Sequence, residues 1–327
     1  MNLESLIREL VDSGGDSALG LTEERDFIGF LKVHLYDQFE PTAFEGGGFY
    51  ERLGKWLGNT ESAKEARRFL FLISKIFFVG REEFKTLYRC ALNEILIPWI
   101  MDVEKVGVED PRLMQKVQQG LDSTWFCPIT DSMRINSFIH VNRLRGFEFR
   151  PDWRSIRKFG DMNIVKEFVD RENIKRIVLL EDFVGTGTQA KKSISHIADN
   201  FPDLDIMVIP LVCCSEGEGV LLEEAGKKDN VSVRPVICIP ASEIVSSIEN
   251  ENDLEHVGEL RALSDQYSSL LELPFQSVKD LGMLGFRNTG ANVVLFSNCP
   301  NNTLAIMHYD GSDSWEPLFP RNSRSNK

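Results

Sequence analysis

The sequence predicts an α/β fold, a mainly parallel sheet flanked by helices, preceded by an N-terminal helical accessory region. From about residue 124, short β-rich runs alternate with segments of helical periodicity, as in α/β domains. The β-rich runs are continuously apolar, which is typical of strands buried on both faces of a parallel sheet. Before residue 124 the patterns are helical.

The first third contains the signals that begin and end helices. Thr22 is predicted to cap a helix whose first turn is acidic, and residues 49–57 form a short amphipathic segment. Ser62 begins a capping-box pattern before an apolar run, and Gly80 is the expected residue just beyond its end. A further helix is predicted over 82–97, ending at a proline.

The later elements define the predicted domain organisation. The predicted strands are 125–129, 176–181, 205–213, 231–239 and 292–296, and the helices between them are 163–173, 188–200 and 219–228. We therefore expect a helical accessory region over 1–120, an α/β domain over 121–321 and a polar tail over 322–327.

Composition excludes several classes of protein. The 327 residues include 37 Lys or Arg and 50 Asp or Glu, giving a net charge of −13, and 42% are hydrophobic. This composition rules out collagenous and disordered chains. Because binding to nucleic-acid phosphates needs basic surface, direct nucleic-acid binding is not expected.

Cytoplasmic localisation is expected, with no membrane association. The N-terminus lacks the apolar core of a signal peptide, and the longest apolar stretch, 69–79, contains Lys75. That stretch is shorter than the ~20 residues of a membrane span. No C-x-x-C spacing favours zinc or a disulfide framework, so we expect small buried hydrophobes at Cys90, Cys127, Cys213, Cys214, Cys238 and Cys299.

The segment most informative about function is residues 176–189, Arg-Ile-Val-Leu-Leu-Glu-Asp-Phe-Val-Gly-Thr-Gly-Thr-Gln. Its apolar start predicts a central strand, and Glu181 and Asp182 lie at the carboxyl end of that strand. The loop that then opens a helix consists of Gly185, Thr186, Gly187 and Thr188. In open α/β sheets, ligands bind at this edge.

The residue types of this loop indicate a phosphorylated sugar. Glycines let backbone N–H groups converge on one point, and the helix N-terminus adds positive potential, which suits a phosphate. The two carboxylates can accept hydrogen bonds from vicinal hydroxyls. A phosphate beside a diol describes ribose 5-phosphate.

Other interpretations of the loop fit less well. A dinucleotide-binding motif could use Gly185, Gly187 and Ala190, but its acidic residue normally follows the glycines by about 20 positions. A P-loop would need a second glycine where Ala190 stands and a hydroxyl where Lys192 stands. A plain strand-to-helix turn with a surface acidic pair is the structural alternative.

The segment resembles the ribose-phosphate-binding signature of type I phosphoribosyltransferases. Its form Glu-Asp-Phe-Val-Gly-Thr-Gly-Thr-Gln is similar to phosphoribosyltransferase-like proteins of bacterial conflict and anti-phage defence systems, some of them associated with retrons. The resemblance extends from about residue 49 to residue 321. Further segments that resemble these proteins are residues 49–57, 82–88, 126–132, 298–304 and 315–321.

The resemblance implies a role for each candidate residue. Glu181 and Asp182 would hold the ribose hydroxyls of phosphoribosyl pyrophosphate, and residues 185–188 would hold its 5-phosphate. Mg²⁺ would bridge the pyrophosphate and the ribose. The pyrophosphate loop would comprise Thr130, Asp131 and Ser132, and further ligand candidates are Arg134 and Arg321.

Two functions remain open at this point. The chain is either a phosphoribosyltransferase-like enzyme that binds phosphoribosyl pyrophosphate or a nucleotide, or a catalytically inactive nucleotide-sensing or protein-interaction module. In both cases the resemblance implies a bacterial anti-phage defence system. Its partners would be other defence proteins or a retron reverse transcriptase.

Overall fold

The computed structural model describes residues 18–41, 47–144, 151–157, 161–271, 273, 281–310 and 314–321. The chain forms two compact units: unit 1 combines Met1–Arg81 with Pro240–Lys327, and unit 2 is Glu82–Ile239. The boundary expected between residues 120 and 121 lies inside unit 2, and the division into accessory region and domain stays a prediction. The expected tail, 322–327, lies outside the described residues.

Unit 2 contains the main sheet. Its helices are α5 (Arg81–Cys90), the π-helical segment η3 (Ala91–Leu96), α6 (Ile97–Glu104), α7 (Leu113–Asp122), α8 (Ile135–Val141), α9 (Trp153–Arg157), α10 (Met162–Arg171), α11 (Thr188–Asn200) and α12 (Ser215–Ala225). Its strands are β2 (Thr124–Pro128), β3 (Arg176–Val184), β4 (Asp205–Cys214), β5 (Val231–Val233) and β6 (Ile237–Ile239).

The sequence predicted a mainly parallel sheet, and every strand pair described in this sheet is parallel. Its order is β2-β3-β4-β5, and β6 also pairs with β4. The predicted strand 231–239 is therefore two short strands, which pair with β4 at Ile206–Val208 and then at Val212–Cys214. The α/β fold class is confirmed.

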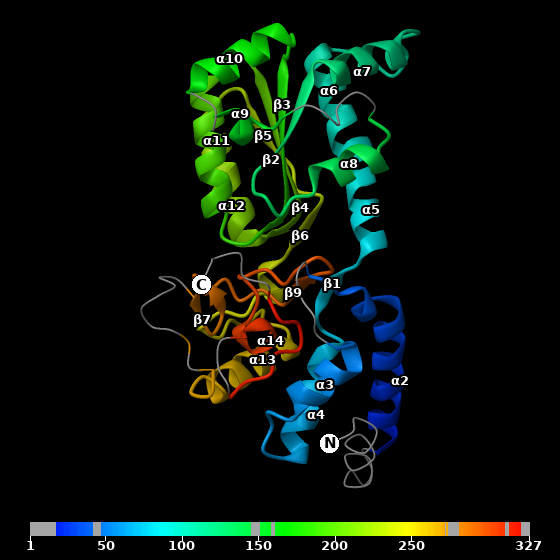
Figure 1. The fold of residues 1–327 in the computed structure, drawn as a ribbon, viewed down its shortest axis with the longest axis vertical. Coiled ribbons are helices and arrows are strands. Elements are labelled where there is room, and N and C mark those ends of the chain that lie inside the picture. Colours follow the sequence, from blue (N-terminus) through cyan, green and yellow to red (C-terminus); the bar gives the residue numbers. More distant parts are fainter. Residues whose placement is uncertain are drawn as a thin grey trace. The chain divides into compact units, whose positions relative to one another are not determined.

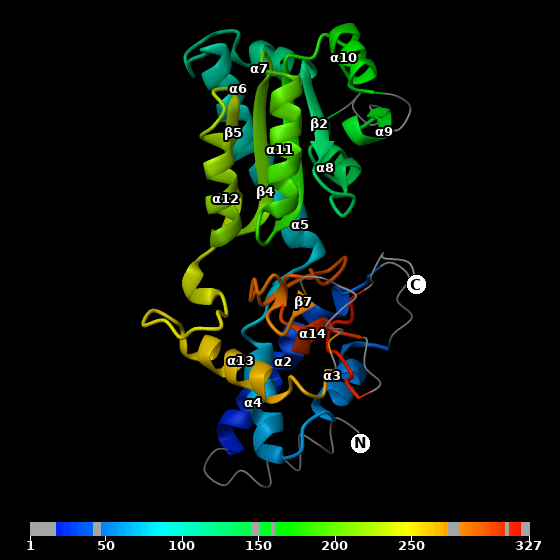
Figure 2. The same cartoon turned by 90° about the vertical axis from the view of Figure 1, so that its left-hand side faces the viewer.

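Helices cover both faces of this sheet (Figure 1). The longer helices α11 and α12 lie in front of it in Figure 2. They share a buried core with α9, α10 and one face of the strands, to which Ile177, Leu179, Ile194 and Leu221 belong. On the opposite face, α8 contacts β2 and η3 contacts β4. Burial on both faces explains why the strand sequences do not alternate.

The helix predicted to end at Ile97 continues to Glu104. Pro98 is the second residue of α6, in the interior of a helical stretch that is continuous from α5 through η3. The π-helical turn of Ala91–Leu96 directly precedes α6. The prediction that Pro98 ends this helix was wrong, because the preceding turn changes to π-helical geometry and the helix continues through the proline.

Unit 1 is built from both ends of the chain. Its elements are α2 (Ala18–His34), η2 (Tyr36–Gln38), α3 (Phe49–Leu57), α4 (Ala63–Ile73), β1 (Phe77–Val79), η4 (Ala241–Glu243), α13 (Glu255–Gln266), β7 (Leu281–Gly282), β8 (Gly285–Phe286), β9 (Val293–Leu295) and α14 (Ala305–His308). Its core mixes residues such as Trp56 and Phe69 with Leu263 and Phe319.

A parallel pair of strands joins the two chain segments of unit 1. Phe77–Val79 pairs with Val293–Leu295, so the predicted strand 292–296 exists but belongs to a separate sheet. The apolar run before Gly80 was predicted to be helical to its end. That prediction was wrong, because α4 ends at Ile73 and the last apolar residues pair with β9.

Two helix starts test the predicted caps. Ser62 caps α4 as predicted, accepting a hydrogen bond from the Glu65 N–H at 3.3 Å. Thr22 lies inside α2, which begins at Ala18, so that cap was wrong because good helix formers extend the helix upstream.

Within the described ranges, no helix combines the length and apolar character that crossing a bilayer requires.

Candidate functional site

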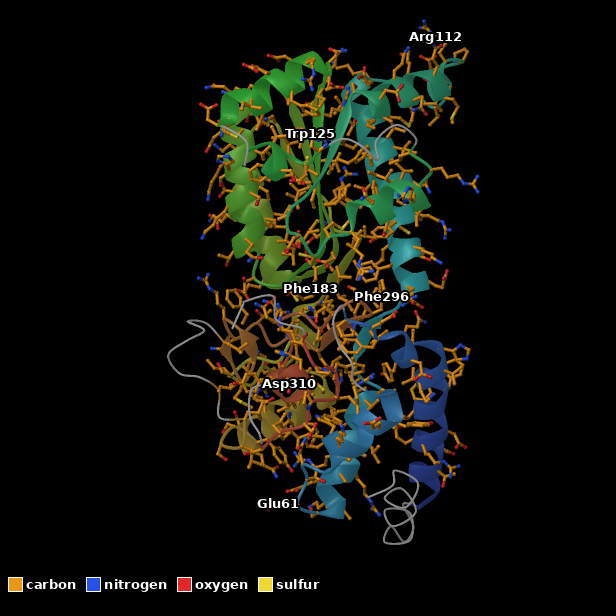
Figure 3. The ribbon with its side chains drawn as sticks, in the orientation of Figure 1. Glu61, Arg112, Trp125, Phe183, Phe296 and Asp310 are labelled. Carbon is orange, nitrogen blue, oxygen red and sulfur yellow. The ribbon has the colours of Figure 1, made fainter. Side chains whose placement is uncertain are left out.

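The acidic pair lies at the carboxyl edge of the sheet in unit 2, the edge at which Figure 3 labels Phe183. Strand β3 runs past the pair to Val184, so Glu181 and Asp182 are within the strand and not in the loop after it. They are 4% and 6% exposed. The sequence predicted their place correctly, but not their burial.

The register of β3 is continuous through the pair. It pairs with β4 from Arg176 with Asp205 to Val184 with Cys213 without a shift. The two consecutive carboxyls nevertheless meet the same neighbours.

The loop after β2 supplies those neighbours. The Thr130 N–H donates to Oε2 of Glu181 at 2.7 Å, and the Thr130 hydroxyl contacts Oε1. The Ser132 hydroxyl donates to Oδ1 of Asp182 at 2.9 Å and lies 3.4 Å from Oε1 of Glu181. The two hydroxyl oxygens are 2.7 Å apart. The structure thus brings Thr130 and Ser132 onto the acidic pair, whereas their role as a pyrophosphate loop stays a prediction.

Burial raises the pKa of both carboxyls, that of Glu181 well above its ordinary value, and the negative charge of Asp182 raises it further. The hydrogen bonds agree with this direction. Thr130 and Ser132 have two hydroxyl hydrogens for three contacts: Glu181 to Thr130, Thr130 to Ser132, and Ser132 to Asp182. A proton on Oε1 of Glu181 completes the chain and leaves Asp182 as the ionised end.

The Gly/Thr loop connects β3 to α11. Thr186 is buried, and its hydroxyl lies 3.1 Å from the Thr188 hydroxyl. Gly187 precedes the helix with a φ of +72°, a conformation that favours glycine. Lys191 donates its N–H to the Gly187 carbonyl at 2.8 Å. The N–H groups of the turn before it have no acceptor within the helix and can bind an anion.

Helix α12 approaches the same loop closely, which the sequence analysis missed. A β-carbon at residue 217 would lie 2.3 Å from the carbonyl oxygen of Gly185. Gly217 therefore lets α12 pack against the loop. The available signal was a glycine four residues beyond the carboxyl end of the predicted strand 205–213.

Tyr88 is a second neighbour that sequence reasoning missed. Its ring packs edge-on against Phe138 of α8 at 5.9 Å, and it is 4% exposed. Burial raises the pKa of its hydroxyl, and the charge of Asp182 raises it further, whereas Arg134 lowers it. No local pattern connects a residue on α5 with this edge, because the contact depends on tertiary packing.

The remaining candidates differ in their placement. Arg134 is exposed and occupies the position before α8, and Asp131 is exposed between the two hydroxyl residues. Arg321 belongs to unit 1, where its Nη1 donates to the Cys299 carbonyl at 2.7 Å. The other candidates all belong to unit 2, where Thr130 and Ser132 are shown in contact with the acidic pair.

The residues present fit a magnesium ion that binds mainly to its ligand. The described part of the chain contains no group of three or more His, Cys, Asp or Glu side chains arranged for a metal. Mg²⁺ often uses one or two carboxylates together with phosphate oxygens and water. Asp182, which accepts a hydrogen bond from Ser132 at 2.9 Å, is a carboxyl at this edge that would be able to serve as such a ligand.

Comparison with known proteins gives one match. A protein-family model described as PRTase-CE matches residues 53–321, which span parts of both units. No curated protein and no solved structure matches.

Proposed function

Because the chain belongs to the PRTase-CE family of phosphoribosyltransferase-like proteins, we propose that unit 2 binds phosphoribosyl pyrophosphate or a nucleotide at the carboxyl edge of its sheet. Glu181 and Asp182 hold the sugar hydroxyls, and residues 185–188 hold the 5-phosphate. Both groups follow one another on a single strand and its loop, so one ligand can reach both.

The hydroxyl pair of Thr130 and Ser132 carries this proposal. Their oxygens are 2.7 Å apart and engage Glu181 and Asp182. Hydroxyls on adjacent carbons of a ribose ring have a comparable spacing. The acidic pair is therefore in contact with an arrangement of two protein hydroxyls that resembles a vicinal diol. A sugar would replace these hydroxyls, and the 130–132 loop would move to contact the pyrophosphate.

The phosphates have separate binding groups. The N–H groups before Lys191 and the hydroxyls of Thr186 and Thr188 face the 5-phosphate. Thr130, Asp131, Ser132 and Arg134 form the pyrophosphate side. Mg²⁺, when bound, neutralises charge on the pyrophosphate, and Asp182 is the carboxylate nearest to supply a ligand.

The proposed reaction is transfer of the phosphoribosyl group to a nitrogen nucleophile. The bond from C1 to the pyrophosphate oxygen breaks, a C1–N bond forms, pyrophosphate leaves and the nucleophile loses a proton. The protein contributes by holding the sugar and the leaving group in place.

Calorimetric titration with phosphoribosyl pyrophosphate and Mg²⁺ tests the binding site. We expect wild-type protein to bind, and Asp182→Asn to lose about ten- to a hundredfold in affinity, as for a hydrogen bond to a charged group. Asp203→Asn is the matched control, because Asp203 is exposed before β4, at the opposite edge of the sheet. Equal affinity of Asp182→Asn and wild type would contradict the site.

A non-catalytic nucleotide sensor is the second candidate function. It is favoured by the engagement of Glu181 with the 130–132 loop, which gives that carboxyl a structural partner. Release of pyrophosphate that depends on an added base separates the two functions. An enzyme shows it, and Asp182→Asn abolishes it, whereas a sensor binds the ligand without releasing pyrophosphate.

We further propose a cytoplasmic role in bacterial anti-phage defence, with other defence proteins or a retron reverse transcriptase as partners. The resemblance of residues 181–189 to the defence-associated signature supports this role. Phage plaque counts on cells carrying the gene with its neighbours test it. Protection should be lost with Asp182→Asn and kept with Asp203→Asn; protection that survives Asp182→Asn would separate defence from this site.

A further inference from the structure

We propose that Tyr88 is a ligand-contact residue, whose hydroxyl donates a hydrogen bond to an anionic oxygen on the pyrophosphate side of the bound ligand. This inference rests on the proposed function and deepens it. It assigns to α5 a part in the site that the strand-and-loop signature does not include.

The position of Tyr88 is fixed by its packing. Its ring contacts Phe138 at 5.9 Å, and Phe138 in turn contacts Phe126 of β2 at 5.6 Å. The side-chain amide of Asn142, just after α8, donates to the Tyr88 carbonyl at 3.0 Å. These contacts hold α5 against α8 and β2, beside the loop that β2 leads into.

The hydroxyl is the unexplained part of this side chain. Tyr88 as a whole residue is 4% exposed, and no described residue forms a hydrogen bond with its Oη, an atom that is itself not fully buried. Buried tyrosine hydroxyls usually have a partner. Its ring packs against α8, which begins directly after Arg134, and the charges of Asp182 and Arg134 both act on the hydroxyl, so the hydroxyl lies near the candidate site.

The groups around the Tyr88 hydroxyl indicate which kind of ligand atom would accept its hydrogen bond. Arg134 is a cation at the start of α8, the helix against which Tyr88 packs. A guanidinium and a neutral phenol together form a donor pair for a phosphate oxygen. The hydroxyl remains protonated at neutral pH, and it can therefore donate throughout the physiological range.

The test compares two ligands, each with Mg²⁺: phosphoribosyl pyrophosphate and ribose 5-phosphate, which lacks the pyrophosphate. Tyr88→Phe keeps the ring and removes the hydroxyl. We expect a loss of about ten- to a hundredfold in affinity for phosphoribosyl pyrophosphate and unchanged affinity for ribose 5-phosphate. The melting temperature of the free protein should not fall, because the hydroxyl has no partner to lose.

Tyr50→Phe is the control, since Tyr50 is exposed and belongs to unit 1. Unchanged binding of both ligands by Tyr88→Phe would overturn the inference. Equal losses for both ligands would also overturn it, because the contact would then be to the sugar or its 5-phosphate. If the wild-type protein binds neither ligand, this result contradicts the proposed function itself, and the inference about Tyr88 is overturned together with it.

Discussion

Glu181 illustrates how one residue's surroundings determine its charge. It is buried beside a second carboxyl, and the hydroxyl chain through Thr130 and Ser132 needs a proton on it. The raised pKa follows from burial first and from Asp182 second. The raised pKa favours the protonated form, in which Glu181 donates from Oε1 and accepts the Thr130 N–H at Oε2.

This protonation predicts how stability depends on pH. A carboxyl with a raised pKa in the folded state binds more protons there than in the unfolded state, so the free energy of unfolding falls as pH rises above about 5. Glu181→Gln imitates the protonated form and should reduce this fall. Chemical denaturation across a pH series measures it, with Glu167→Gln as the exposed control. An unchanged slope in Glu181→Gln would contradict a protonated Glu181.

The candidate residues themselves could be predicted from sequence to a large extent. An acidic pair after four apolar residues and before a Gly/Thr loop indicates a site at a strand end, and Thr130 and Ser132 do lie against the pair. Tyr88 could not be predicted, because its place depends on how α5 packs against α8. The burial of Glu181 depends likewise on tertiary contacts.

Among the secondary-structure elements, α12 determines the shape of the phosphate loop. Its Gly217 lies so close to Gly185 that a methyl group must displace the loop. Gly217→Ala should lower the free energy of unfolding by about 1–3 kcal/mol, as overpacking does, and weaken ligand binding. Thermal unfolding and calorimetry measure the two effects.

Gly219→Ala is the matched control on the same helix. A β-carbon at residue 219 meets no atom within 4 Å, so alanine should stabilise α12 by about 0.5–1 kcal/mol through its higher helix propensity. Similar effects of the two substitutions would mean that the close approach at Gly217 does not constrain the loop.

Element boundaries were predicted well where local signals decide them and poorly where partners do. The apolar runs at β2, β3 and β4 are strands because continuous apolar residues suit a sheet buried on both faces. The run before Gly80 has a helical sequence, yet Phe77–Val79 is a strand because β9 pairs with it. A pairing over so long a sequence separation has no local signature.

For the whole molecule, the two units have separate cores, and the two ends of the chain share one of them. Phe319 contacts the rings of Tyr36, Phe39, Phe49 and Phe78. Phe319→Ala should therefore destabilise unit 1 by about 3–5 kcal/mol. Hydrogen exchange should accelerate in the described residues of both chain segments, 18–81 and 240–321, while β3 and β4 of unit 2 keep their protection.

Phe71→Ala provides the comparison, since Phe71 lies on α4 and is 39% exposed. It should leave exchange in both segments nearly unchanged. Faster exchange confined to the C-terminal segment of Phe319→Ala would show that the two segments do not form one cooperative unit. The sequence gives no direct sign of this shared core, since its two parts are separated by all of unit 2.

The order of the two units along the chain has a consequence for biosynthesis. Unit 2 is a continuous stretch, so every strand of its sheet is translated before the second half of unit 1. Strand β1 must wait for β9. The sheet of unit 2, with its candidate site, can therefore fold while the amino-terminal helices still lack the C-terminal segment that they pack against. The apolar surface of these helices is exposed during that time, and we expect chaperones to bind there.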